Sequence, residues 1–140
     1  VLVWAGFIAW GAYFTVGKDA LTKTISATIF GAVMAAIAVG IVALLDDYLA
    51  VGIAAPIAVG LTVYGLTAFD KLNNVPANVF GYAATFGFLL MGTGFNDALG
   101  MEGANLIALD LANPIIVTSL SFVLGSVFGL ISEKVAGMLK

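Results

Sequence analysis

The placement of the charged residues is the feature of this sequence that most constrains its fold. Only five lysines and eight acidic residues occur among the 140 residues, and they leave long stretches uncharged. A helix needs about 20 apolar residues to span the hydrocarbon core of a bilayer. The uncharged stretches are 1–17, 24–45, 48–69, 72–96 and 111–132. The last four reach that length, which predicts an integral membrane protein that crosses the bilayer several times.

The spans are expected to be helices, because lipid offers no hydrogen-bond partner and each span must satisfy its own backbone. Strands of a barrel would alternate in polarity over about ten residues, and these stretches are continuously apolar. We predict helices at Val1–Val16, Ile25–Leu45, Leu49–Phe69, Ala77–Met91 and Pro114–Met138. The fold class is therefore all-α, a polytopic transmembrane bundle with five spans, and residues 1–140 form a single transmembrane domain.

One segment between the last two predicted helices fits no span. Residues 104–109 are moderately apolar but too short to cross a membrane. Two interpretations stay open for them, a helix on the membrane surface and a partial re-entrant segment.

The composition excludes several classes of protein. Hydrophobic residues make up 62% of the chain and charged residues 9%, whereas a soluble domain has about 25% charged residues. No basic run exists that would favour nucleic acid. The chain has neither His nor Cys, so the usual zinc ligands and Ser–His or Cys–His catalysis are missing. We expect no catalytic residue, no metal, no cofactor and no enzymatic activity.

The lysines predict how the chain is oriented in the membrane. With five spans, all of them fall on one side, namely Lys18, Lys23, Lys71, Lys134 and Lys140. The positive-inside rule places that side in the cytoplasm. The C-terminus is then cytoplasmic and Val1 starts on the outer side. A further upstream helix would return the N-terminus to the cytoplasm.

Two pairs of predicted helices resemble each other. Gly6–Ala9 can be aligned with Gly81–Ala84, and Ile29–Val33 with Val123–Val127. The two copies are three spans apart and would cross the membrane in opposite directions, as in the inverted repeats of transporters and channels. The alternative is coincidence, because small apolar residues align easily. Small-residue spacing also marks three glycines as helix-packing candidates, Gly31, Gly125 and Gly129.

Several short motifs resemble one family of membrane proteins. They are Trp4-Ala5-Gly6-Phe7 with Ala12-Tyr13-Phe14, Val75-Pro76 with Phe80-Gly81 and Ala84-Thr85-Phe86, and Leu124-Gly125 with Phe128-Gly129. Together they resemble the YcdZ-like bacterial inner-membrane proteins, the domain-of-unknown-function family 1097. That family often has Gly where this chain has Ala77. The resemblance implies a bacterial inner-membrane location and an additional N-terminal helix, but no activity and no site residues.

The neutral polar residues inside the spans are the remaining candidates for function. Four of them lie on the last two predicted helices and could line a path, namely Asn78, Thr85, Thr118 and Ser121. No ionisable residue lies deep in a span, which disfavours a proton-coupled pump. We predict a channel or facilitator for a small uncharged solute. The alternative for each hydroxyl is a bond within its own helix or glue between helices.

A second function stays open beside the channel. A structural or assembly subunit of a larger membrane complex would explain the small size and the many small residues. Under either function we expect the lipid bilayer and other copies of the chain as partners, so that the protein is a homo-oligomer. Partner subunits of a membrane complex are possible, and nucleic acid is not expected.

Overall fold

The computed structural model describes residues 2–69, 74–90, 109 and 113–139, and this part of the chain contains five α-helices and no strand. The helices are α1 (Val3–Val16), α2 (Ala20–Leu45), α3 (Val51–Ala68), α4 (Val75–Leu90) and α6 (Pro114–Met138). The all-α fold class is thus confirmed. Of residues 104–109, for which two interpretations were open, all but Leu109 lie outside the described part.

The helix ends differ from the prediction by a few residues. The largest difference is at α2, which begins at Ala20 rather than Ile25. The prediction stopped at the charge of Lys23, but the helix continues through that residue with its side chain exposed. A lysine can do this because its apolar stem lies along the helix while its ammonium group reaches water.

Three of the described helices are long and apolar enough to cross a membrane. They are α2 with 26 residues, α3 with 18 and α6 with 25. At about 1.5 Å per residue, even α3 covers about 27 Å, close to the thickness of the hydrocarbon core. The other two, α1 with 14 residues and α4 with 16, are apolar but shorter. The molecule is therefore a helical protein of membrane type.

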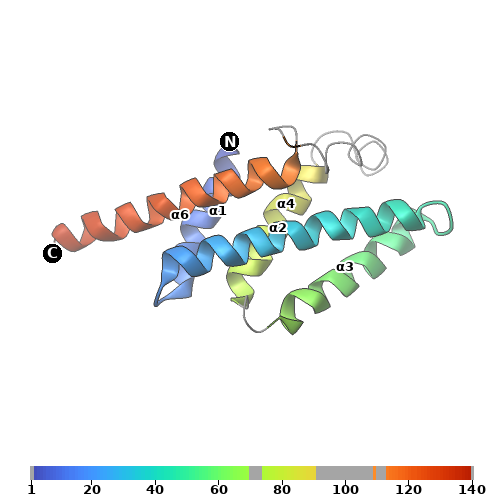
Figure 1. Cartoon of the computed structure of the whole chain (residues 1–140), viewed down its shortest axis with the longest axis horizontal. Helices are drawn as coiled ribbons and strands as arrows, with labels where there is room; N and C mark the ends of the chain where they lie inside the picture. Colours follow the sequence, from blue (N-terminus) through green and yellow to red (C-terminus); the bar gives the residue numbers. More distant parts are fainter. Residues whose placement is uncertain (1, 70–73, 91–108, 110–112, 140) are drawn as a thin grey trace.

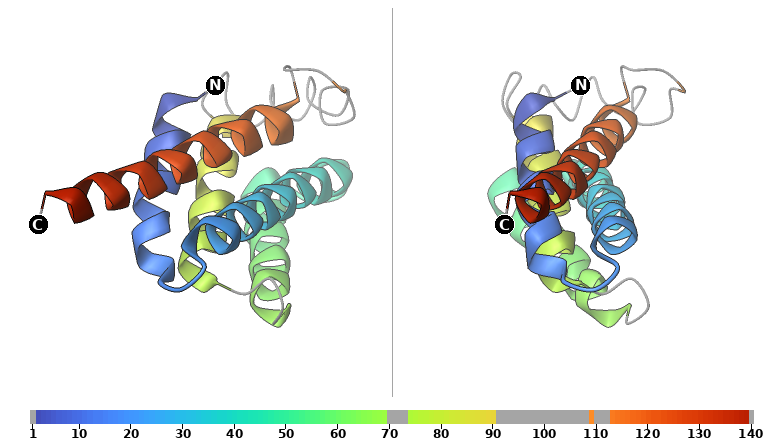
Figure 2. Two further views of the ribbon diagram at one scale, coloured as in Figure 1. Left: turned by 60° about the vertical axis from the view of Figure 1, so that its left-hand side comes forward. Right: turned by 90° about the vertical axis from the view of Figure 1, so that its left-hand side faces the viewer.

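The helices form two crossed pairs with one helix added. In Figure 2, α1 and α4 run side by side in opposite directions, and α2 and α6 lie across them, also in opposite directions. The most extensive contacts are those of α2 with α4 and of α1 with α6. After a tight connection, α3 turns back along α2 (Figure 1).

The interior is built mainly from alanine. One core cluster gathers Ala5, Ala9, Ala32 and Ala84 around Phe122, and all five side chains are fully buried. Large apolar side chains such as Phe7 and Tyr64 are instead exposed. Small residues inside let helix backbones approach closely, and large apolar residues outside suit contact with lipid. This distribution agrees with a protein surrounded by hydrocarbon.

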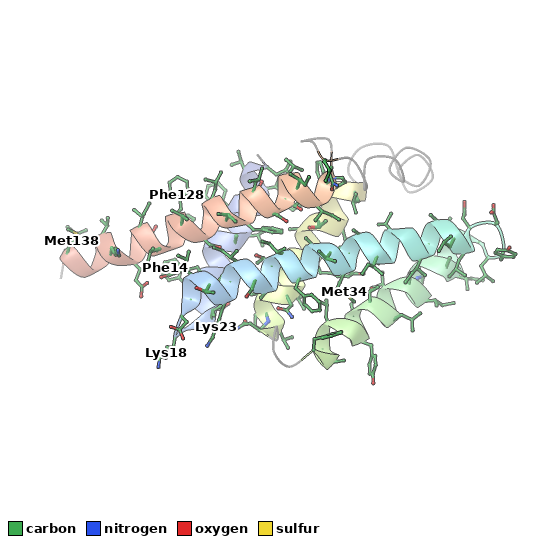
Figure 3. The ribbon with its side chains drawn as sticks, in the orientation of Figure 1. Phe14, Lys18, Lys23, Met34, Phe128 and Met138 are labelled. Atoms are coloured by element: carbon green, nitrogen blue, oxygen red, sulfur yellow. The ribbon has the colours of Figure 1, made fainter. Side chains whose placement is uncertain are left out.

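A sharp reversal joins α1 to α2. Gly17 has φ of 78° and Asp19 has φ of 59°. Two of the three residues that connect the helices therefore have a positive φ. Glycine adopts such angles without steric cost. The turn leaves Lys18 exposed at the end of α1, as Figure 3 shows.

Candidate functional site

The crossing of α2 and α4 brings two backbones into direct contact. A Cβ placed on Gly31 would lie 2.1 Å from the carbonyl oxygen of Asn78, and one on Gly81 would lie 2.1 Å from the carbonyl oxygen of Thr28. Real Cβ atoms cannot approach an oxygen so closely. The two helices can therefore cross at this distance only because both positions are glycine.

The crossing of α1 and α6 is built in the same way. A Cβ on Gly125 would lie 2.0 Å from the carbonyl oxygen of Gly6, and one on Gly129 would lie 2.6 Å from Cγ of Tyr13. The structure thus places Gly31, Gly125 and Gly129, the three packing candidates, at helix contacts. The first two face backbone, and the third faces an aromatic ring.

The four candidate path residues are all buried. Asn78 is 1% exposed and Thr85, Thr118 and Ser121 are fully buried. Only two of them are brought together by a hydrogen bond, since the Thr85 hydroxyl donates to the Thr118 hydroxyl at 3.3 Å, linking α4 to α6. Ser121 instead accepts a hydrogen bond from the backbone N–H of Leu2 at 2.8 Å.

Most buried hydroxyls are satisfied within their own helix. The hydroxyl of Thr118 donates to the carbonyl of Pro114 at 2.7 Å, and that of Ser121 donates to the carbonyl of Val117 at 2.7 Å. Threonine and serine in membrane helices commonly bond to the carbonyl four residues earlier. Three of the four candidates therefore have partners in the protein.

Asn78 differs from the other candidates. Neither its amide nitrogen nor its amide oxygen has a hydrogen-bond partner among the described residues. An amide offers two donor hydrogens and two acceptor lone pairs, and a buried polar group without partners costs several kcal/mol in an apolar environment. The backbone of Asn78 lies in the α2–α4 contact, and its buried side chain has no hydrogen-bond partner among the described residues.

Two more buried hydroxyls lack a partner within the described residues, those of Thr24 and Ser126. The sequence reasoning did not include either of them. Helical spacing could have found both. Thr24 precedes the buried Thr28 by one turn, and Ser126 follows the buried Phe122 by one turn of α6.

A further polar contact near the ends of α1 and α6 was also missed. The phenol of Tyr13 donates a hydrogen bond to Oε2 of Glu133. The predicted helix Pro114–Met138 already contained Glu133, but the sequence analysis assigned no contact to this residue. In the structure its carboxylate ties the end of α1 to α6.

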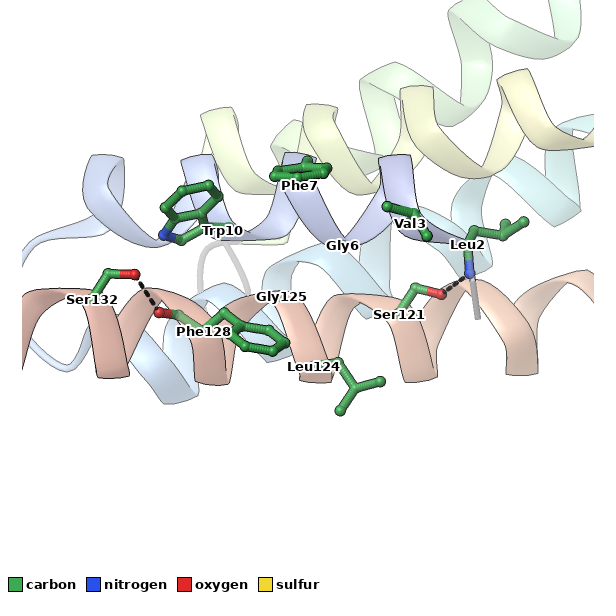
Figure 4. A pocket seen from close by; sticks show the side chains of 10 residues that line it. All are labelled: Leu2, Val3, Gly6, Phe7, Trp10, Ser121, Leu124, Gly125, Phe128 and Ser132. Carbon is green, nitrogen blue, oxygen red and sulfur yellow. Dashed lines mark hydrogen bonds between the residues drawn. The ribbon is translucent and has the colours of Figure 1, made fainter.

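Apolar grooves open on the surface of the described residues, and two of them involve α1. One, of about 380 Å³, lies between α1 and α6 (Figure 4) and is lined by Leu2, Val3, Gly6, Phe7, Trp10, Ser121, Leu124, Gly125, Phe128 and Ser132. Both of its serines donate to backbone carbonyls. The other, of about 470 Å³, lies between α1 and α4 and is lined by Phe7, Ile8, Gly11, Ala12, Thr15, Phe80 and Ala83. Asn78, Thr85 and Thr118 line neither groove.

The residues that the structure describes hold no group of His, Cys, Asp and Glu side chains that could bind a metal ion. The buried polar side chains of the described residues belong to Asn, Thr and Ser, so they are neutral amides and hydroxyls. They can exchange hydrogen bonds with a small neutral molecule.

Comparison with known proteins identifies the family. The family model described as "Protein of unknown function (DUF1097)" matches residues 1–137. The match covers nearly the whole chain, so the protein belongs to this family, and the resemblance seen in the sequence is confirmed. No curated protein and no solved structure matches the chain.

Proposed function

We propose that this family member is a channel or facilitator for a small uncharged solute. The observation that carries the proposal is the side-chain amide of Asn78, which is 1% exposed and has no partner in the described part of the chain. A permeating molecule with donors and acceptors would supply the missing hydrogen bonds. The proposed path runs beside α4 and α6, past Asn78, Thr85, Thr118 and Ser121.

The chemistry of this interior favours a neutral solute. An ion in the membrane needs compensating charges or ordered rings of carbonyls. The buried polar side chains in the described part of the chain are Thr, Asn and Ser, without a charged one among them. Neutral donors and acceptors suit molecules such as urea, ammonia or small alcohols.

We also propose five spans arranged as an inverted repeat, with α1 and α2 corresponding to α4 and α6. The glycine contacts support this proposal. In the sequence alignment Gly6 corresponds to Gly81 and Gly31 to Gly125, and these are the residues at the two crossings. Corresponding helices also run in opposite directions (Figure 2). Transporters and channels often place their path between two such halves.

The proposed location is the bacterial inner membrane, with the C-terminus in the cytoplasm. The support is the lysine distribution, with Lys18 and Lys23 at one end of α2 and Asp46 and Asp47 at the other. In intact cells, a single cysteine at Asp47 should react with an impermeant thiol reagent, and one at Lys18 should not. The reverse pattern would contradict the orientation.

Solute flux into proteoliposomes tests the channel. We expect flux of at least one neutral solute among urea, ammonia and small alcohols, and none of ions. Asn78→Leu keeps a side chain of similar volume without hydrogen bonds and should lower that flux about tenfold, equivalent to about 1.4 kcal/mol. Thr67→Val is the matched control, because Thr67 is exposed and bonds to its own helix.

Two results would contradict the proposal. The first is the absence of protein-mediated flux for every neutral solute tried. The second is an Asn78→Leu variant with unchanged flux and a higher melting temperature. Removing a buried polar group that nothing binds is neutral or stabilising, so that result would make Asn78 a structural feature only.

The second candidate function is a structural or assembly subunit without catalytic activity. It is favoured by the many large apolar side chains on the surface, such as Phe128, which is 62% exposed. Absence of solute flux, together with stable association of the chain with other subunits of a membrane complex, would favour this function.

A further inference from the structure

The centre of the bundle holds one large side chain among small ones. Phe122 of α6 is the largest of the fully buried side chains in the described part of the chain. It packs in one cluster with alanines from three other helices, namely Ala5 and Ala9 of α1, Ala32 of α2 and Ala84 of α4. All four helices of the two crossed pairs therefore contribute to the surroundings of a single phenyl ring.

Three buried polar side chains without a partner lie near this cluster. Thr24, Asn78 and Ser126 are at most 1% exposed, and their unpaired polar atoms have no hydrogen-bond partner among the described residues. Counted from the cluster residue on the same helix, Thr24 is eight residues away, Asn78 six and Ser126 four. At about 1.5 Å per residue, they lie about 12, 9 and 6 Å along their helices from the cluster.

The three unpartnered side chains lie toward the same end of the bundle. A second cluster joins the end of α1 to the first turns of α2 and α4, through Ala12, Ala27 and Ala77. The hydrogen bond from Tyr13 to Glu133 joins the end of α1 to the second half of α6. Because α2 and α6 run in opposite directions (Figure 2), the start of α2 and the end of α6 lie on one side of the Phe122 cluster. We call the interior on this side the lysine-side half, after Lys23 beside Thr24.

The polar side chains on the other side of the cluster have partners. Thr118 and Ser121 precede Phe122 on α6, and both hydroxyls donate to carbonyls of their own helix. Thr85 of α4 donates to Thr118, and Ser121 also accepts from the backbone of Leu2. A solute would have to displace hydrogen bonds there. In the lysine-side half it would supply hydrogen bonds that buried groups lack.

The helix crossing itself does not require a phenyl ring at this position. In the proposed repeat, Phe122 corresponds to Thr28, since each directly precedes its aligned segment. Thr28 is also fully buried. The α2–α4 crossing is nevertheless as close as the α1–α6 crossing, because a Cβ on Gly31 or on Gly125 would lie 2.1 or 2.0 Å from a carbonyl oxygen. A crossing of this kind therefore forms with a smaller residue in the place of Phe122.

We propose that Phe122 closes the solute path and limits the size of the solute that passes, with Thr24, Asn78 and Ser126 binding the solute in the lysine-side half. This inference rests on the proposed channel function and adds its constriction and two further binding residues. A hydrophobic constriction closes a pore because it excludes water. Since the neighbours of Phe122 are alanines, the size of the side chain at this position decides how much room a solute has.

Graded replacement of the ring tests the constriction. In proteoliposomes, Phe122→Leu and Phe122→Ala should raise the flux of neutral solutes several-fold, the alanine variant more than the leucine variant, with a larger increase for small alcohols than for ammonia. Leu66→Ala is the matched control, because Leu66 is 2% exposed and packs in the cluster between α2, α3 and α4. It leaves a cavity as well, but away from Phe122, and should not raise flux. Phe122→Leu removes less volume and keeps the test valid if Phe122→Ala fails to fold.

A matched pair of threonines tests the binding groups. Thr24 and Thr28 are both fully buried and lie one turn apart on α2, but only the hydroxyl of Thr28 is bonded within its own helix. Thr24→Val should lower the flux several-fold, and Thr28→Val should leave it unchanged. Equal flux in the two variants would overturn solute binding at Thr24.

The outcomes distinguish this inference from the channel itself. Wild-type flux that depends on Asn78 and is unchanged in both Phe122 variants would overturn the constriction, while the proposed function would stand. A rise in flux as large in Leu66→Ala would indicate a general leak and overturn the constriction as well. Absence of flux in the wild type and in both Phe122 variants would overturn the channel and the constriction together. Flux that appears only when the ring is replaced would support the constriction.

Discussion

The second halves of α2 and α6 differ in how far the rest of the chain covers them. On α2, Ala35, Ala38 and Val42 are fully buried, packed in clusters that include α3 residues such as Leu66. On α6, Phe128 and Val135 are exposed. Small residues occur where the chain covers its own helix, and large apolar residues occur where it does not. The size of the outward side chains thus indicates whether a helix face has a partner within the same chain.

The first halves of the two helices are alike. α2 crosses α4 at Gly31, and α6 crosses α1 at Gly125, each with backbone against backbone. The crossings need the same residue because the same physical limit applies, namely the absence of room for a Cβ. The two helices therefore share their inner contacts and differ in what lies beyond them.

The largest expected effect comes from filling the crossings. Gly31→Ala and Gly125→Ala should each lower the free energy of unfolding by about 1–3 kcal/mol or more, because each Cβ would force two backbones apart. Thermal unfolding of the detergent-solubilised protein measures both. Gly40→Ala is the control, since a Cβ there meets nothing within 4 Å. If Gly31→Ala lowers the free energy of unfolding and Gly125→Ala leaves it unchanged, the two crossings are not equivalent.

A smaller loss of stability should distinguish the second half of α2 from the end of α6. Ala38→Leu places a large side chain under α3, where Ala38 is fully buried, and should cost about 1–3 kcal/mol by overpacking. Ala136→Leu makes the same change at an exposed position of α6 and should change stability by less than about 0.5 kcal/mol. The same melting experiment compares them. Similar losses of unfolding free energy in the two variants would mean that the end of α6 is covered as tightly as that of α2.

The helices could be predicted from the sequence, but their contacts could not. The uncharged stretches located all five described helices, although the first stretch is shorter than a span and α2 begins five residues before its predicted start, because lipid forces each span to satisfy its own backbone. From Ile29 to Leu45, α2 is apolar on every side, so no polar face indicates which side of this stretch meets α4. The contact depends on Gly31 and Gly81 together, and nothing in one helix alone reveals the other.

The candidate site was predicted in part. Spacing selected Asn78, Thr85, Thr118 and Ser121, and all four are buried. Whether a hydroxyl bonds to its own helix or remains available depends on the residues across the interface, so spacing could not distinguish Ser121 from Ser126. Asparagine is different, because an amide in a helix cannot satisfy all its donors and acceptors locally.

The isolated amide of Asn78 also bears on how the protein enters the membrane. The hydroxyls of Thr28, Thr118 and Ser121 are bonded within their own helices, so α2 and α6 can enter lipid with these groups already satisfied. α4 has only 16 residues, about 24 Å of helix, and carries an amide that lipid cannot satisfy. If α4 spans the membrane as proposed, its amide needs a partner outside its own helix. Because α2 precedes α4 in the chain, the glycine face of α2 at Gly31 is already present when α4 packs against it. The order of the helices along the chain thus suits this order of assembly.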